Sequence, residues 1–163
     1  MKKFELTAES KINIFGKKLF RIKALISFGD VEEGETGGWI EKEENLEQSS
    51  GNAWVYGNAE VYGNAWVYGN VEVSGNARVS GNARVSGDAD YTTIHGFGTQ
   101  FRTTTFFQCE DKQIRVSCGC FLGTIPEFRE QVKNTREGKI AEEYLMIADL
   151  MEKHFVKEKE SGE

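Results

Sequence analysis

The sequence predicts a mostly β fold with some α: a short, single-stranded parallel β-helix capped by an N-terminal β-hairpin and by a C-terminal β-hairpin plus two helices. Three observations predict it. A six-residue phrase repeats from Gly51 onward, apolar residues alternate in the segment before the repeat, and a helical stripe of apolar residues occupies the last part of the 163-residue chain. Eighteen glycines and one proline indicate many tight turns that keep their backbone N–H groups.

The N-terminal cap is assigned to residues 1–30. Within it, KINIFGKKLFRIKAL (11–25) predicts two strands that turn at Gly16-Lys17, since apolar residues alternate on both arms. The segment that follows contains Val31, Ile40 and Leu46, which we expect to line an irregular first coil before the period begins.

The repeat itself runs as GNAWVY, GNAEVY, GNAWVY, GNVEVS, GNARVS, GNARVS and then GDADYT. A small residue at the third place and Val at the fifth are two apart, which is the pattern of a short strand with one buried face. Gly-Asn supplies the turn because both residues tolerate left-handed backbone angles. An antiparallel meander rarely keeps a strict period of six, so we assign 31–97 to a parallel β-helix.

The repeat resembles that of left-handed β-helix proteins, in which three hexapeptides form a triangular coil of about eighteen residues. The hand and the coil length come from this resemblance. They place the following neighbours on the three faces: Trp54 with Glu72 and Asp90, Glu60 with Arg78, and Trp66 with Arg84. We expect Glu60 and Arg78 to form an exposed ion pair, and Trp66 and Arg84 a cation–π contact.

Aromatic residues gather in the first regular coil of the repeat. They are Trp54, Tyr56, Tyr62, Trp66 and Tyr68. Five exposed aromatic side chains would form an unusually large apolar patch, so we expect the N-terminal segment to cover part of this belt. The remainder is predicted to bind a partner, because Trp and Tyr supply a large, rigid contact area.

The C-terminal cap is assigned to residues 98–158. TTTFFQC and QIRVSCGCF predict two strands around the turn 110–112, and Thr124 with Glu127 forms a capping box that opens a helix. A second helix from about Lys139 carries an apolar stripe that we expect to pack on the hairpin or on the end of the repeat: Ile140, Tyr144, Ile147, Ala148, Met151 and Phe155. Residues 159–163 are predicted to be a disordered tail.

Three cysteines raise the question of a metal site. Cys109 and Cys118 are predicted on opposite strands of a hairpin, with Cys120 two residues further on, and His154 or, alternatively, His95 could complete a structural zinc site. Buried free thiols that act as small hydrophobic side chains are the favoured alternative. No cofactor is required.

Charge is unevenly distributed along the chain. The formal net charge is −6, which argues against direct binding of nucleic acid. Residues 1–29 contain seven Lys or Arg and two Glu, whereas 30–47 contain eight Asp or Glu and one Lys. This acidic run, and Glu41, Glu43 and Glu44 in particular, is predicted to dock on a Lys/Arg-rich surface of a protein, unless it is only a solvated loop.

The location expected from the sequence is the cytoplasm. The N-terminus has positive charge without an apolar core, no window is long enough to span a membrane, and an odd number of cysteines favours reduced thiols.

Enzymatic chemistry is not expected. The acyltransferases built on a left-handed β-helix need a general-base His and walls of several coils, and this repeat is short and contains no His. No phosphate-binding glycine loop and no Cys/His pairing for nucleophilic catalysis stand out.

Several phrases together resemble the hexapeptide-repeat, "polymer-forming"-type proteins of phages and prophages of Gram-positive bacteria. They are KINIFGKKLFRIKAL, GETGGWIEKEENL, the GNAxVYG repeats, IRVSCGCFLGTIPEF and EYLMIADLMEKHF. The resemblance implies a phage setting and a bacterial host cytoplasm. The resulting hypothesis is a non-enzymatic counter-defence inhibitor, similar to an anti-CRISPR, that binds a basic nucleic-acid-binding nuclease of the host and blocks nucleic-acid loading. The alternatives are a homo-oligomeric, polymer-forming scaffold and a protein that binds a nucleotide or an acyl donor.

Overall fold

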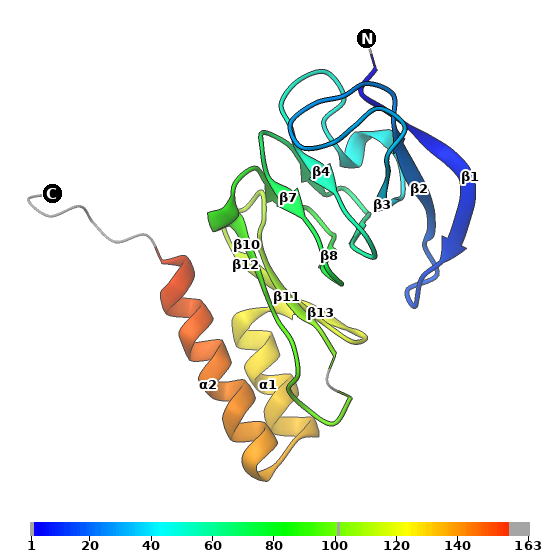
Figure 1. Ribbon diagram of the computed structural model, residues 1–163. Helices are drawn as coiled ribbons and strands as arrows, with labels where there is room; N and C mark the ends of the chain where they lie inside the picture. The colour runs from blue at the N-terminus through cyan, green and yellow to red at the C-terminus, as the bar shows by residue number, and fades with distance from the viewer. Residues whose placement is uncertain (1, 101, 157–163) are drawn as a thin grey trace, which may run out of the picture.

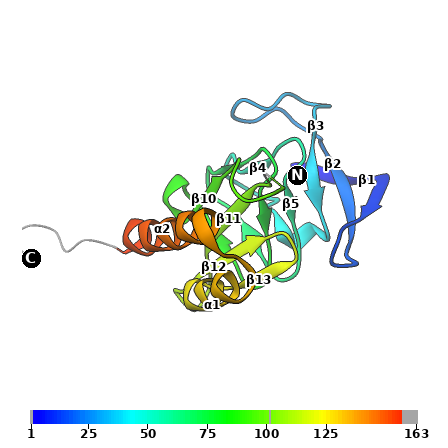
Figure 2. The same ribbon diagram turned by 90° about the horizontal axis from the view of Figure 1, so that it is seen from below.

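A computed structural model describes residues 2–100 and 102–156 (Figure 1). The tail predicted at 159–163 lies outside the described residues. Strands form most of the structure, and two helices lie at the end of the molecule opposite the N-terminal strands, as both ribbon views show (Figures 1 and 2).

The N-terminal segment forms the predicted hairpin. Strand β1 (Phe4–Ile12) pairs antiparallel with β2 (Lys18–Ala24), and the chain turns through Gly16, whose φ of 78° suits a residue without a side chain. Strand β3 (Thr36–Ile40) then pairs antiparallel with β2. Val31, Ile40 and Leu46 are buried in the main core, where their apolar pattern had placed them.

Each regular copy of the repeat contributes a strand of two residues. These strands are β4 (Trp54–Val55), β5 (Glu60–Val61), β6 (Trp66–Val67), β7 (Glu72–Val73), β8 (Arg78–Val79) and β9 (Arg84–Val85). They pair in parallel with the strand three copies later, and the predicted neighbours Trp54–Glu72, Glu60–Arg78 and Trp66–Arg84 are confirmed. The valines and most of the small residues point into one core.

The predicted fold class is nevertheless wrong. The sheets of the described residues are small: one is mixed, one is antiparallel and two are parallel pairs, and none forms a solenoid or a closed barrel. Pairs β4–β7 and β6–β9 are separate two-stranded sheets, whereas β5 and β8 extend the hairpin into a mixed sheet of order β1-β2-β3-β5-β8. Strand β3 of the flanking segment pairs in parallel with β5, so one of the three ladders of the repeat is joined to the hairpin sheet.

The seventh copy leaves the repeat pattern. Asp88–Asp90 form a 3₁₀ helix instead of a strand, so the predicted position of Asp90 beside Glu72 is wrong. Ala89 is exposed, and the next strand, β10 (Tyr91–Ile94), pairs with β11 of the C-terminal sheet. The hydroxyl of Tyr91 reaches back to donate to the Glu72 carbonyl oxygen at 2.6 Å.

The C-terminal part is an antiparallel sheet with two helices packed on it. Its strands are β10, β11 (Thr104–Gln108), β12 (Ile114–Cys118) and β13 (Phe121–Thr124), in that order. Helix α1 (Ile125–Thr135) begins at the predicted capping box, in which Thr124 N donates to Glu127 at 2.8 Å. Helix α2 (Gly138–Phe155) buries its predicted stripe against α1 and the sheet (Figure 2).

Two apolar cores result, and strand β11 joins them. Phe107 lies in the core of the repeat, whereas the adjacent Phe106 lies in the core of the helices. Backbone contacts fix β11 to the last copies of the repeat: Arg78 N donates to Thr105 Oγ1, and Glu110 N to the Asn82 carbonyl. The hairpin and the repeat share the first core, a single cluster of buried side chains whose members range in sequence from Phe4 to Cys109.

Candidate functional site

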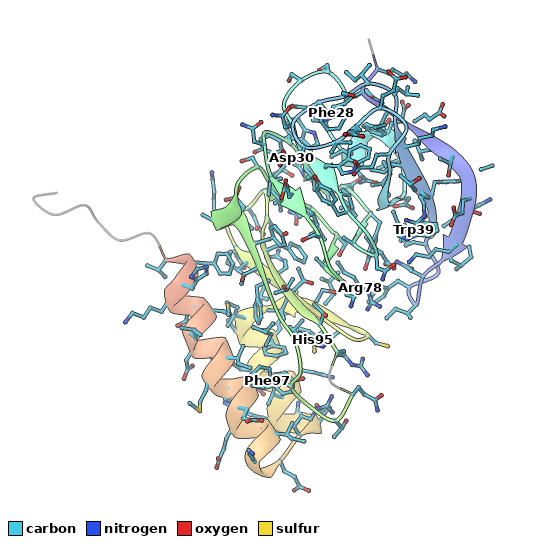
Figure 3. All side chains as sticks on the ribbon, viewed as in Figure 1. Phe28, Asp30, Trp39, Arg78, His95 and Phe97 are labelled. Carbon is cyan, nitrogen blue, oxygen red and sulfur yellow. The ribbon has the colours of Figure 1, made fainter. Side chains whose placement is uncertain are left out.

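Some members of the aromatic belt are buried and others exposed, even where the local sequence is identical. The seven residues 51–57 and the seven residues 63–69 are both GNAWVYG. Trp54 in the first is 0% exposed, whereas Trp66 in the second is 37% exposed. Phe28 and Phe4 pack edge-on against the Trp54 indole, with centroids 5.3 and 6.3 Å away (Figure 3 labels Phe28). Trp54 is therefore a core residue, and its predicted place on the contact surface is corrected.

Two tyrosines of the belt are also engaged by the chain itself. Tyr62 is buried in a small cluster with Leu19 and Trp39, with Phe15 packed against it. Tyr56 is half-buried on the main core, and its hydroxyl lies 3.5 Å from a carboxylate oxygen of Glu72. The N-terminal segment thus covers part of the belt, as expected, although the sequence did not indicate which part, and Tyr62 is removed from the candidate surface.

The remaining two aromatic residues form an exposed stack. The rings of Trp66 and Tyr68 lie 3.9 Å apart at their centroids and 18° from parallel. Trp66 lines a groove of about 760 Å³, and Tyr68 lines a neighbouring hollow of about 580 Å³. Arg84 and Glu110 line both. The stack is thus a ridge between two hollows. Its indole contacts Tyr68 instead of forming the predicted cation–π contact with Arg84.

The acidic run lines the same groove, and Leu46 after it pairs in parallel with Val67. A 3₁₀ helix at Glu43–Asn45 presents Glu43 and Glu44 to it, beside Trp66. The complete lining is Lys42, Glu43, Glu44, Leu46, Glu47, Gln48, Ser49, Asn64, Ala65, Trp66, Arg84 and Glu110. Of the eight contact residues predicted from sequence, the structure therefore brings Glu43, Glu44 and Trp66 to one groove and Tyr68 to its edge.

Asn45 fixes this arrangement, and sequence reasoning missed it. Its side chain is fully buried; Oδ1 accepts from the N–H groups of Glu41 and Lys42, and Nδ2 donates to the carbonyls of Gly63 at 3.2 Å and Ala65 at 2.9 Å. These bonds tie the acidic turn to the backbone that precedes Trp66. The only sequence signal is an Asn among acidic residues, which does not distinguish such a role from a solvated turn.

Charges around the groove are only partly neutralised. Glu43 pairs with Lys2 at 2.9 Å, and Arg84 pairs with Glu110 at 3.4 Å. Glu41 instead accepts from the Gly63 N–H at 2.8 Å, which makes it a structural residue. Glu44 is exposed and forms no ion pair within the described part of the chain. Its carboxylate is the one most available to a cation from outside.

The predicted ion pair of Glu60 with Arg78 exists, but it is not exposed. Glu60 is 6% exposed, lies 3.0 Å from Lys11 Nζ and 3.9 Å from Arg78 Nε, and accepts a hydrogen bond from Asn13. Lys11 also lies over the Trp39 ring at 4.6 Å (Figure 3 labels Trp39 and Arg78). The N-terminal hairpin, which the ion-pair prediction did not include, covers this face and buries the carboxylate.

Lys3 lies at the N-terminal end of the repeat, and sequence reasoning did not predict its role there either. Its ammonium donates to the Ala53 carbonyl at 3.0 Å and lies 4.8 Å from the centre of the Phe28 ring. Burial lowers the pKa of Lys3, and Glu47 acts in the opposite direction. Backbone carbonyls at the start of the repeat are thereby satisfied within the chain.

The cysteines and histidines predicted as zinc ligands are not assembled. Cys109 follows β11 at one end of the hairpin, whereas Cys118 pairs with Thr104 at the other end. Thr104 is five residues before Cys109, so at the rise of a β-strand about 16 Å separates the two cysteines along the hairpin. Cys120 is exposed in the turn. His154 packs on Phe155, and His95 shares a hydrogen bond with Thr103. No group of three potential metal ligands occurs among the residues described.

Cys109 behaves as a buried apolar side chain. Burial raises the pKa of its thiol from 9.0 to about 11. It belongs to the core of the repeat, and its N–H donates to the Gln113 carbonyl at 3.0 Å.

No helix in the described part of the chain is long and apolar enough to cross a membrane. In comparisons with known proteins, no protein-family model matches the chain, and none of the curated proteins matches it.

Proposed function

We propose that the protein is a non-enzymatic binding protein whose groove takes a Lys/Arg-bearing surface of a partner protein. The observation that carries the proposal is the stack of exposed Trp66 on Tyr68, beside a groove that the acidic 3₁₀ helix also lines. An indole presents its face to a cation, and a free carboxylate in the same groove can pair with the same cation. Trp66 and Glu44 are the central contacts, with Tyr68 and Glu43 beside them.

Geometry supports a protein as the occupant. The groove is open, wide and lined by polar side chains around one aromatic ridge, which is the composition of a contact surface with a central anchor. Small-molecule pockets are usually enclosed and mostly apolar. The net charge of −6 disfavours a nucleic-acid backbone and favours a basic protein surface.

The resemblance to phage and prophage proteins supports a more specific partner. A basic surface that a phage gains from covering is the nucleic-acid channel of a host nuclease, so the protein would act in the bacterial cytoplasm as a counter-defence inhibitor. It would compete with nucleic acid for Lys and Arg side chains. The outcome of this competition depends on whether the protein or the nucleic acid is added to the nuclease first. Once nucleic acid occupies the channel, its Lys and Arg side chains are no longer free to bind the protein.

The contacts at the two ends of the repeat disfavour end-to-end stacking of several copies of the protein into a scaffold. The first end is closed by Lys3 and by the side chain of Gln48, which pairs with the backbone of Phe4. The last end is covered by β11 through the Ala83–Cys109 bridge. Backbone groups that would pair with another copy are thus satisfied at these positions.

The test is a cleavage assay with RNA-guided nucleases of Gram-positive bacteria. The protein is added to each nuclease before or after its target DNA, and remaining activity is measured. We expect inhibition only when the protein is added first. Glu44→Lys should weaken inhibition at least about tenfold, because it places like charges in contact.

Glu142→Lys is the matched control, since Glu142 is exposed near the start of α2, outside the groove. It should inhibit like the unchanged protein. Equal loss in both variants would assign the effect to net charge, and full activity of Glu44→Lys would remove the groove from the mechanism. No inhibition of any nuclease tested would contradict the counter-defence role.

A further inference from the structure

The arginines of this chain divide into two groups. Five form ion pairs with carboxylates: Arg21, Arg78, Arg84, Arg115 and Arg129. Arg102 and Arg136 form none with the residues that the structure describes, and both line a single pocket in the C-terminal part. Both side chains are exposed, and Arg136 Nη1 donates to the Thr135 carbonyl at 3.4 Å. Their positive charges are therefore open to an anion from outside.

The pocket lies between the β12–β13 turn and the two helices and has a volume of about 480 Å³. Phe121, Phe128 and Tyr144 form its aromatic wall: the Phe121 and Tyr144 rings each lie 5.8 Å from Phe128, at 52° and 89°. Its lining contains no Asp and no Glu. The size is in the range of small-ligand sites, about 300–1,000 Å³, and the combination of an apolar wall with a few polar groups is typical of them.

Both guanidinium groups are within electrostatic reach of the pocket's buried phenol. Burial raises the pKa of Tyr144, and the charges of Arg136 and Arg102 act in the opposite direction. The Cys118 thiol is a hydrogen-bond partner of the same phenol and also raises its pKa. Arg102 also lies against the backbone of Gly119, where a side chain would meet the guanidinium. Gly119 thus leaves room for Arg102 at the pocket.

We propose that this pocket binds a small organic anion that carries a flat ring. The ring packs against Phe121 and Phe128, and a phosphate or carboxylate is held by Arg102 and Arg136. Guanidinium groups suit both anions because their N–H groups match two oxygens at once. The site is separate from the groove of Trp66 and Glu44, and it stands or falls independently of the proposed function.

Calorimetric titration of the full chain at low salt tests the site with four probes. These are AMP and indole-3-acetate, which combine a ring with an anion, adenosine, which lacks the anion, and inorganic phosphate, which lacks the ring. We expect at least one ring-bearing anion to bind with a Kd below about 1 mM and about tenfold more tightly than adenosine and inorganic phosphate. Binding of AMP alone indicates a phosphate ligand, and binding of indole-3-acetate alone a carboxylate.

Substitutions locate the binding. Arg102→Gln combined with Arg136→Gln should weaken it at least about tenfold, since two charge-assisted contacts are lost. The matched control is Arg129→Gln, whose side chain pairs with Asp149 and Glu152 outside the pocket and should leave the Kd unchanged. NMR shift changes on titration of the unchanged protein should centre on Phe121 and Tyr144. The proposal is overturned if neither ring-bearing anion binds below about 1 mM, if the double variant binds normally, or if the shifts centre elsewhere.

Discussion

The ring of Phe28 meets the indole of Trp54 edge-on, with 5.3 Å between centroids and 70° between planes. Trp54 and Trp66 each lie within the seven-residue sequence GNAWVYG. No ring of the described N-terminal residues packs on Trp66, which stacks on Tyr68 and stays 37% exposed. Burial in this repeat is thus decided by which flanking segment lies over each copy. The two tryptophans form a natural pair for separating stability from binding.

Trp54→Ala should lower the free energy of unfolding by about 3–5 kcal/mol, because it leaves a cavity under Phe4 and Phe28. Trp66→Ala, in the identical local sequence, should cost no more than about 1 kcal/mol through the lost stack. Urea unfolding followed by circular dichroism measures both. Similar losses in the two variants would contradict the assignment of Trp54 to the core and Trp66 to the surface.

Glu60 should contribute more to stability than a surface carboxylate. Glu60→Gln keeps the shape but removes the charge that faces Lys11 and Arg78, so we expect a loss of about 1–3 kcal/mol. Glu9→Gln is the control, because Glu9 is exposed and pairs with Arg21 on the same hairpin. That change should cost less than about 1 kcal/mol. Thermal unfolding at one pH compares them, and an equal cost would show that Glu60 is solvated.

Asn45 should be needed for the shape of the groove. Asn45→Ala removes four hydrogen bonds, two within the acidic turn and two from the turn to the repeat, so the free energy of unfolding should fall by about 2–4 kcal/mol. Asn64→Ala is the control, since Asn64 is exposed and accepts one side-chain bond from Lys42. Its cost should stay below about 1 kcal/mol. A harmless Asn45→Ala would mean that the turn holds its position without the amide.

Cys109 should react slowly with iodoacetamide. Burial raises the pKa of its thiol to about 11, so the Cys109 thiol stays protonated and shielded from the reagent. Cys120 is exposed and accessible to it. Mass spectrometry at mildly alkaline pH should find alkylation of Cys109 at least about tenfold slower than that of Cys120. As pH rises from 9 toward 11, the unfolded chain loses this proton before the folded chain does, so stability should fall. Equal alkylation rates would show that Cys109 is accessible.

Much of the local structure could be predicted because local patterns determine it. Alternating apolar residues predicted the β1–β2 hairpin, and two strand-like segments around the turn 110–112 predicted the β11–β12 hairpin. The Thr124–Glu127 box predicted the start of α1, and the period of six predicted the parallel partners of the repeat. These features depend on residues near each other in sequence or on strict spacing. They are insensitive to what packs above them.

The covering of the repeat could not be predicted in the same way. Nothing in GNAWVYG distinguishes Trp54 from Trp66, because Phe28 and the hairpin that cover the first copy are distant in sequence. The joining of β5 and β8 to the hairpin sheet, which overturns the predicted fold class, has the same origin. Half of the predicted contact residues reached the groove or its edge, and the structural role of Asn45 had no sequence signal.

Trp66 gives the most direct test of the binding groove, because Trp39 and Trp54 are buried and only Trp66 is exposed to a ligand or quencher. A nine-residue arginine peptide, titrated into the protein while Trp emission is followed, stands in for the basic partner surface. We predict a saturable change in emission that Trp66→Phe removes and that Glu44→Lys weakens at least about tenfold, whereas Glu142→Lys does not. An unchanged emission, or equal weakening by both lysine substitutions, would contradict binding of a cationic surface at this groove.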